Sequence, residues 1–265
     1  MPTLRINGCN YYYQSHGSGP ETMVLSHGLL WSGHMFYKQV DYFKDCYRII
    51  TYDHRGQGKT GLTAGGYDMD SLYLDAVELL KQLNLSAVHF GGLSMGGFVA
   101  MRLAARRPDL VKSLILMETS AQSEPNKFKY NLLKTIVRLF GVNSVVKPVM
   151  KIMFGKTFLN DPERQEERLF WTEQLGKNQK SIIRAVAGVI DRKGVEQELC
   201  KIRCPTLILV GTEDVGTTPE KAEFIQSKIP HAELKYIENA GHTACIEEPE
   251  QYNIEIEKFL LKMKD

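Results

Sequence analysis

The sequence has no long apolar run and no strong excess of charge of either sign. No stretch approaches the roughly 20 consecutive apolar residues of a membrane-spanning helix, so we expect no integral membrane segment. Lys and Arg total 33 and Asp and Glu total 31, and this net charge of +2 offers no overall field to recruit nucleic acid. The first residues lack a basic segment followed by an apolar one, so we expect no secretory signal.

Cysteine is scarce, and its spacing excludes a disulfide-rich class of protein. The chain has only five cysteines in 265 residues, and this odd number is scattered along it. Cys200 and Cys204 lie close together, but no second pair of Cys or His completes a zinc site. We therefore predict free thiols, a cytoplasmic location, no metal site and no cofactor.

Short runs of β-branched and aromatic residues alternate with helical patterns along most of the chain. The runs cover residues 23–27, 47–52, 87–90, 114–117, 206–210 and 234–237, and helical periodicity marks residues 69–83 and 98–106. Two further runs, at 4–6 and 11–13, flank Asn7-Gly8, which is a hairpin signal. This order predicts the α/β class, with a mostly parallel, eight-stranded sheet, helices on both faces and an antiparallel edge.

The alternation stops between residues 119 and 203, where no convincing strand appears. We therefore expect a core formed by residues 1–118 and 204–265, with residues 119–203 inserted as a helical cap. From Lys127 to Lys156 there are seven basic residues and no acid, interleaved with apolar side chains. Three interpretations fit this pattern: packed helices with a solvated basic face, a lid over a hydrophobic substrate, and a surface that contacts a membrane. We favour the lid.

A glycine-flanked serine is the strongest chemical signal. Gly92-Leu93-Ser94-Met95-Gly96 follows the run at 87–90 and opens a helix, which is the context of a G-x-S-x-G nucleophile elbow. Side chains two residues either side of the serine would collide in so sharp a turn, which explains the glycines at 92 and 96. Ser94 is therefore predicted at the carboxyl edge of the sheet, where open α/β sheets bind ligands.

A serine hydroxyl needs a base, and the base needs an orienting carboxylate. His242 follows the last predicted strand, and Asp214 follows the strand at 206–210, so both loops reach the edge that carries Ser94. We predict Ser94, Asp214 and His242 as nucleophile, acid and base, with Glu213 as the alternative acid. The backbone N–H groups of Leu29 and Met95 are the expected donors of an oxyanion hole.

These motifs resemble the α/β-hydrolase superfamily along nearly the whole chain. They are His27-Gly28, Asp53-His54-Arg55-Gly56-Gln57-Gly58, the turn from Gly92 to Gly97, and Asp214 with His242. The serine turn is similar to that of 3-oxoadipate enol-lactonases and cofactor-free bromoperoxidase-type esterases, and acyl-homoserine lactonases of this fold are similar in size and cap position. The resemblance implies an α/β-hydrolase fold with a helical cap after the sixth strand. Phe36 departs from the tryptophan of many members.

The predicted function is cleavage of a carboxylic ester or lactone with a hydrophobic acyl portion, through an acyl-enzyme. An acyl-homoserine lactone is a specific candidate substrate, and we expect a small-molecule partner and no nucleic acid. A carbon–carbon bond hydrolase, or a signalling receptor that keeps the triad but turns over little, are the alternatives. Dehalogenase and epoxide hydrolase chemistry is disfavoured, because those members carry aspartate at the serine position. Trp31, His34 and Trp171 are candidate substrate contacts, because aromatic groups often line such sites.

The sequence also contains a glycine pattern typical of dinucleotide sites. Gly56-Gln57-Gly58-Lys59-Thr60-Gly61 follows a predicted strand, but the residues after it do not continue as a helix. We therefore interpret this segment as a structural turn.

Overall fold

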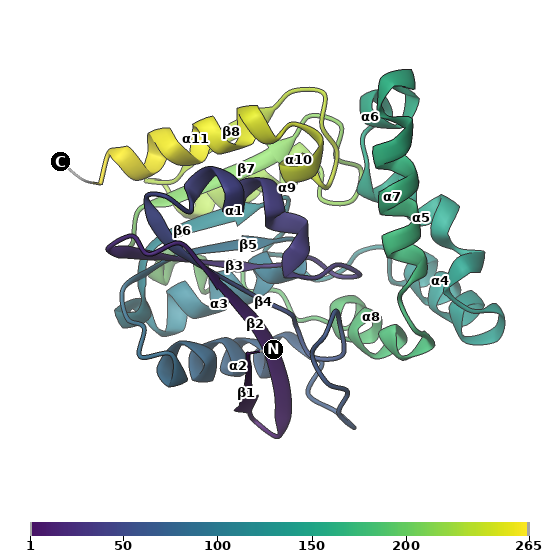
Figure 1. Ribbon diagram of the computed structural model, residues 1–265, viewed down its shortest axis with the longest axis horizontal. Coiled ribbons are helices and arrows are strands. Elements are labelled where there is room, and N and C mark those ends of the chain that lie inside the picture. The colour runs from purple at the N-terminus through teal and green to yellow at the C-terminus, as the bar shows by residue number, and fades with distance from the viewer. Residues whose placement is uncertain (1, 264–265) are drawn as a thin grey trace.

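The computed structural model describes residues 2–263, which build one eight-stranded sheet of order β1-β2-β4-β3-β5-β6-β7-β8 (Figure 1). The strands are β1 (Thr3–Ile6), β2 (Cys9–His16), β3 (Glu21–Ser26), β4 (Tyr47–Tyr52), β5 (Val88–Leu93), β6 (Val111–Met117), β7 (Thr206–Gly211) and β8 (Glu233–Ile237). The pairs formed by β2 with β1 and with β4 are antiparallel, and all other pairs are parallel. The predicted mostly parallel sheet is confirmed. Residues 1, 264 and 265 of the expected core lie outside the described residues.

The antiparallel edge begins with the predicted hairpin. Asn7 has φ +42° and Gly8 has φ +81°, so both turn residues adopt the left-handed conformation that a two-residue hairpin turn needs. Ile6 pairs with Cys9 directly across this turn.

Helices cover both faces of the sheet, because alternate side chains of each central strand point to opposite faces. Val24 of β3 packs in an apolar cluster with α2 (Met69–Gln82), α3 (Met95–Arg106) and α9 (Pro219–Lys228). Its neighbours Met23 and Leu25 pack in a second cluster with α1 (Tyr37–Phe43), α10 (Ala244–Glu247) and α11 (Pro249–Leu261). Figure 1 shows α1 and α11 on one side of the strands and α2 and α3 on the other.

Five α-helices follow β6 before the chain returns to the sheet at β7. They are α4 (Lys127–Phe140), α5 (Val146–Met153), α6 (Lys156–Asn160), α7 (Gln165–Gly176) and α8 (Ile183–Ile190), and they lie together beside one end of the sheet (Figure 1). We keep the name cap for residues 119–203. No helix among residues 2–263 is long and apolar enough to cross a membrane.

Candidate active site

Ser94 occupies a strained turn between β5 and α3. Its φ of +52° and ψ of −109° are unusual for a residue with a side chain, and neighbouring groups hold this conformation. The Ser94 N–H donates to the Met117 carbonyl at the end of β6 (2.8 Å), and the Ser94 carbonyl accepts from the Thr119 hydroxyl (2.8 Å). Both elements reach closer to the serine than predicted, since β5 ends at Leu93 and α3 begins at Met95.

The two flanking glycines are required for different reasons. A Cβ atom on Gly92 would lie 2.3 Å from the Gly96 carbonyl oxygen, which is the predicted collision across the turn. A Cβ atom on Gly96 would lie 2.0 Å from the carbonyl oxygen of Ser26 in β3. Gly96 is thus required because α3 starts directly against the neighbouring strand, a contact that the local sequence does not reveal.

His242 and Asp214 meet at the same edge of the sheet. His242 Nδ1 lies 2.9 Å from Asp214 Oδ2, and both side chains are buried. The Asp214 carboxylate also accepts from the N–H groups of Gly216 (2.7 Å) and Thr217 (2.9 Å) and from the Thr217 hydroxyl (2.7 Å). A carboxylate can only accept, so the imidazole proton belongs on Nδ1 and Nε2 stays free to accept.

Ser94 and His242 line one cavity, although no hydrogen bond joins their side chains anywhere in the described structure. Such a contact commonly tightens only when substrate is bound. The sequence placed these two residues and Asp214 on three separate loops, and the structure brings all three loops to the carboxyl ends of β5, β7 and β8.

The alternative acid, Glu213, faces the cap. Its carboxylate accepts from the Thr157 N–H (2.8 Å) and the Thr157 hydroxyl (2.7 Å) at the start of α6. The side chain is only 11% exposed, so Glu213 does not face solvent. Glu213 contacts α6 and Asp214 contacts His242, because adjacent residues of the loop after β7 point in different directions.

The loop after β3 passes directly over Ser94. A Cβ atom on Gly28 would lie 3.6 Å from Ser94 Cβ, and the next residue, Leu29, lines the cavity. The backbone N–H groups of Leu29 and Met95 donate to no other group within residues 2–263. Both predicted donors are therefore free to meet a ligand.

Gln57 supports this loop and was missed by the sequence analysis, which assigned it only to a structural turn. Leu30 has φ +74°, and its N–H donates to Gln57 Oε1 (2.8 Å). Gln57 Nε2 lies 3.7 Å from Met95 Sδ. One buried amide therefore contacts Leu30, which follows Leu29, and the side chain of Met95. Gln57 and Leu30 are 27 positions apart, and no local pattern connects them.

The turn that carries Gln57 is structural, as expected. Asp53 accepts from the N–H groups of Gly33 (2.8 Å) and Lys59 (2.7 Å), and the next helix starts only at Met69. His27 is also structural, because its Nε2 accepts from the His54 N–H (2.8 Å) and its Nδ1 lies 2.7 Å from the Gly28 carbonyl oxygen. Burial lowers the pKa of His27, which keeps the ring neutral.

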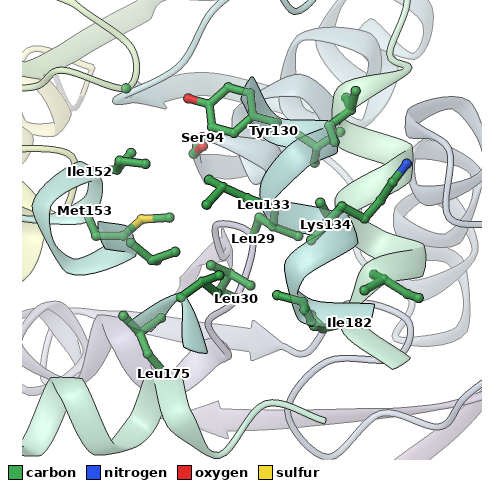
Figure 2. A pocket seen from close by; sticks show the side chains of 18 of the residues that line it. Leu29, Leu30, Ser94, Tyr130, Leu133, Lys134, Ile152, Met153, Leu175 and Ile182 are labelled. Carbon is green, nitrogen blue, oxygen red and sulfur yellow. The ribbon is translucent and has the colours of Figure 1, made fainter. Parts of the chain in front are cut away.

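The cavity at Ser94 has a volume of about 140 Å³ and aliphatic walls (Figure 2). Leu29 and Leu30 come from the core, and the cap supplies Leu133 of α4, Met153 of α5 and Leu175 of α7, among others. Its buried charges, Glu124 and Arg192, form an ion pair at 3.0 Å with side chains 8% and 3% exposed. Half-buried Lys134 also lines the cavity without an ion pair, and most of the remaining wall is apolar.

The candidate substrate contacts Trp31, His34 and Trp171 do not line this cavity. They line a second, more polar cavity, and the rings of Trp31 and Trp171 pack perpendicular at 5.3 Å. Leu30 borders both cavities, so its turn separates these aromatic side chains from the serine. Phe36 also lies away from the Ser94 cavity, fully buried in the core.

No group of three or more His, Cys, Asp or Glu side chains among residues 2–263 has the arrangement of a metal site. A further buried acid, Glu247, instead joins the histidine loop to the cap. It accepts from the N–H groups of Gly155 (2.8 Å), Gly241 (3.0 Å) and Thr243 (3.2 Å). These contacts fix the two residues that flank His242 against the start of α6. A Cβ atom on Gly241 would lie 2.3 Å from the Gly155 nitrogen, so this junction is closely packed.

The buried carboxyl of Glu247 predicts a specific pH dependence of stability. Burial raises its pKa from 4.5 to about 7 in the folded chain. The unfolded chain therefore releases this proton at lower pH, and the contribution to stability is complete below pH 4.5 and is lost as the pH rises to about 7. The loss amounts to about 3 kcal/mol.

Glu247→Gln removes this titration, so we expect the free energy of unfolding of the wild type to fall relative to that of the variant across this pH range. Urea unfolding of both proteins at a series of pH values measures the difference. A difference that stays constant with pH would contradict the assignment.

Comparison with known proteins agrees with the fold. A family model described as the alpha/beta hydrolase fold matches residues 21–144. The 3-oxoadipate enol-lactonase 2 of Acinetobacter baylyi is 27% identical over 256 residues, which cover 96% of this chain and 94% of that protein. An Agrobacterium fabrum protein named "Putative carbamate hydrolase RutD" is 26% identical over 261 residues, covering 94% of this chain and 98% of that protein.

Among solved structures, a thermophilic esterase from Thermogutta terrifontis matches with a TM-score of 0.89 and 27% identity, over 98% of both chains. These relatives have nearly the same length and agree with the resemblance that the motifs indicated. Similarity along almost the whole chain shows that this chain has the α/β-hydrolase fold and resembles enol-lactonases and esterases of that fold.

Proposed function

We propose that the protein is a serine hydrolase that cleaves a carboxylic ester or lactone with an uncharged, apolar acyl portion. One observation carries this proposal: Ser94, on its strained turn, and the Asp214–His242 pair open onto the same aliphatic cavity. Relatives named as an enol-lactonase and an esterase support the class of reaction.

In the proposed mechanism the Ser94 hydroxyl attacks the substrate carbonyl, and His242 Nε2 takes its proton. Asp214 holds the proton on Nδ1 and stabilises the imidazolium that forms. His242 then protonates the departing alcohol, and the same steps with water release the acid. Gly216, Thr217 and the Thr217 hydroxyl keep the Asp214 carboxylate in position during this cycle.

Negative charge develops on the carbonyl oxygen during each attack. The free N–H groups of Leu29 and Met95 are the proposed donors to this oxygen, and each is worth roughly 2.7–4 kcal/mol in sites of this kind. Met95 adds the favourable field of a helix N-terminus. Gln57 is proposed to position both donors, since it contacts Leu30 and Met95.

The charge and volume of the cavity restrict the acyl groups that the substrate can carry. Arg192 is already paired with Glu124, and Lys134 is only half-buried, so a second carboxylate on the substrate, as in an adipate-derived lactone, would find no fully buried unpaired cation there. The volume of about 140 Å³ is close to that of a cavity that holds benzene. We therefore propose acyl chains from butanoate to octanoate, including those carried by a homoserine lactone.

The test is a panel of straight-chain esters from acetate to dodecanoate, with acyl-homoserine lactones of the same chain lengths. We expect kcat/KM to rise from acetate and to peak between butanoate and octanoate. Absence of turnover on every ester and lactone would contradict the proposed reaction.

A variant at the cap end of the cavity tests the chain-length assignment. Ile182 lines the cavity far from Ser94 (Figure 2), so Ile182→Phe is expected to shift the peak to shorter acyl chains and to leave acetate hydrolysis unchanged. Ile182→Leu preserves the volume and serves as the matched control. An unchanged chain-length profile in Ile182→Phe would show that the acyl chain does not enter this part of the cavity.

A further inference from the structure

Helix α4 has an outward apolar face that no other part of the described chain covers. Phe128 is 86% exposed, and Leu132 and Leu139 are 54% and 63% exposed. These positions, spaced by four and seven residues, form one stripe along the helix. Phe140, at the end of the helix, is 74% exposed. Isolated exposed apolar residues are ordinary, but a row of them on one helix marks an interaction surface.

Basic side chains flank this stripe. On α4 they are Lys127, Lys129 and Arg138. None of these three forms an ion pair within residues 2–263, and residues 127–156 contain no acid. The outer side of α4 is therefore both apolar and positive.

This combination of exposed apolar and basic side chains favours the surface of an anionic lipid bilayer as the binding partner. Aromatic and leucine side chains bury themselves at the boundary between headgroups and acyl chains, while lysine and arginine next to them attract anionic headgroups. A second copy of the same face would bring like charges together, which opposes self-association. An acidic protein would pair with the basic side chains, but it would not explain why Phe128 and Phe140 are so fully exposed.

We propose that the outer face of α4 docks the protein on anionic membranes. The opposite face of the same helix carries Tyr130, Leu133 and Val137, which line the Ser94 cavity (Figure 2). One helix thus separates the membrane surface from the cavity, and an apolar substrate that dissolves in the bilayer would be concentrated beside it. This docking rests on the cap surface and does not depend on the proposed reaction.

Sedimentation with phospholipid vesicles tests the proposal. The full-length protein is expected to bind vesicles that contain phosphatidylglycerol, to bind pure phosphatidylcholine vesicles at least tenfold more weakly, and to lose affinity as salt is added. Both Phe128→Ser/Leu139→Ser and Lys127→Glu/Arg138→Glu should lower the partition coefficient at least tenfold. None of the four residues lines the Ser94 cavity, so butanoate ester hydrolysis should stay unchanged and reports that the variants fold.

The matched control is Leu74→Ser/Lys81→Glu, which changes an exposed leucine and an exposed lysine of α2, outside the cap, and should leave vesicle binding intact. Failure of the wild type to bind anionic vesicles would overturn the proposal. Binding that is abolished by the charge reversals but survives Phe128→Ser/Leu139→Ser would also overturn it, in favour of an acidic macromolecule.

Discussion

Ser94→Ala is expected to lower kcat for ester hydrolysis by roughly 10⁴-fold or more, because the acyl-enzyme can no longer form. The strained turn should survive the change. The contacts that hold it, to Met117 and Thr119, involve the Ser94 backbone N–H and carbonyl rather than its hydroxyl. Steady-state hydrolysis of a butanoate ester measures the loss, and circular dichroism measures the fold.

A covalent label separates nucleophilic attack from simple binding. A fluorophosphonate should inactivate the wild type with a stoichiometry of about one per chain and leave Ser94→Ala unlabelled. Ser120→Ala is the matched control, since Ser120 is also a buried serine next to the sheet edge and should keep both labelling and activity. Labelling of Ser94→Ala at the same rate as the wild type would place the nucleophile elsewhere.

Asp214→Asn is expected to lower kcat by about 10⁴-fold with little change in fold, because an amide favours the wrong imidazole tautomer. In the wild type, Asp214 Oδ2 accepts from His242 Nδ1 at 2.9 Å. The asparagine side chain can present its NH₂ group to that nitrogen and leave the proton on Nε2, where it blocks proton transfer from serine. The side chain of Asp214 is fully buried, so water is poorly placed to replace the carboxylate.

Glu213→Gln is the control for this prediction, because Glu213 precedes Asp214 directly and was the alternative acid. It contacts Thr157 of α6 instead of His242, so we expect its kcat to stay within about fivefold of the wild type. A loss in Glu213→Gln as large as that in Asp214→Asn would contradict the assignment of the acid.

The parts of this fold that follow from short-range patterns were predicted well. The Asn7-Gly8 hairpin, the central strands and the serine turn depend on neighbours within a few residues, and the structure contains all of them. The meeting of Asp214 and His242 also follows from the sequence, although the two residues are 28 positions apart. Parallel strands deliver their carboxyl ends to one edge, so strand order alone brings those loops together.

Contacts between side chains of separate elements could not be predicted in this way. Gln57 supports the Leu30 turn, and Glu247 joins Gly155 to the histidine loop from 92 positions away. Trp31 and Trp171, which are candidate substrate contacts, line the second cavity rather than the cavity at Ser94. Each of these outcomes depends on how a loop or a cap helix is oriented on the core, and the apolar pattern of a single segment does not encode that orientation.

The sequence by itself therefore determined the class of sheet, the run of helices between β6 and β7 and the arrival of the Ser94, Asp214 and His242 loops at one edge, because each depends on local conformation or on the topology of parallel strands. Only the tertiary structure decided which faces of the cap helices meet the core. That packing made the Ser94 cavity small and mostly apolar, and it left the outer face of α4 exposed. The physical reason is that burial is a property of the assembled helices, and an amphipathic segment with two apolar faces does not specify which of them will be covered.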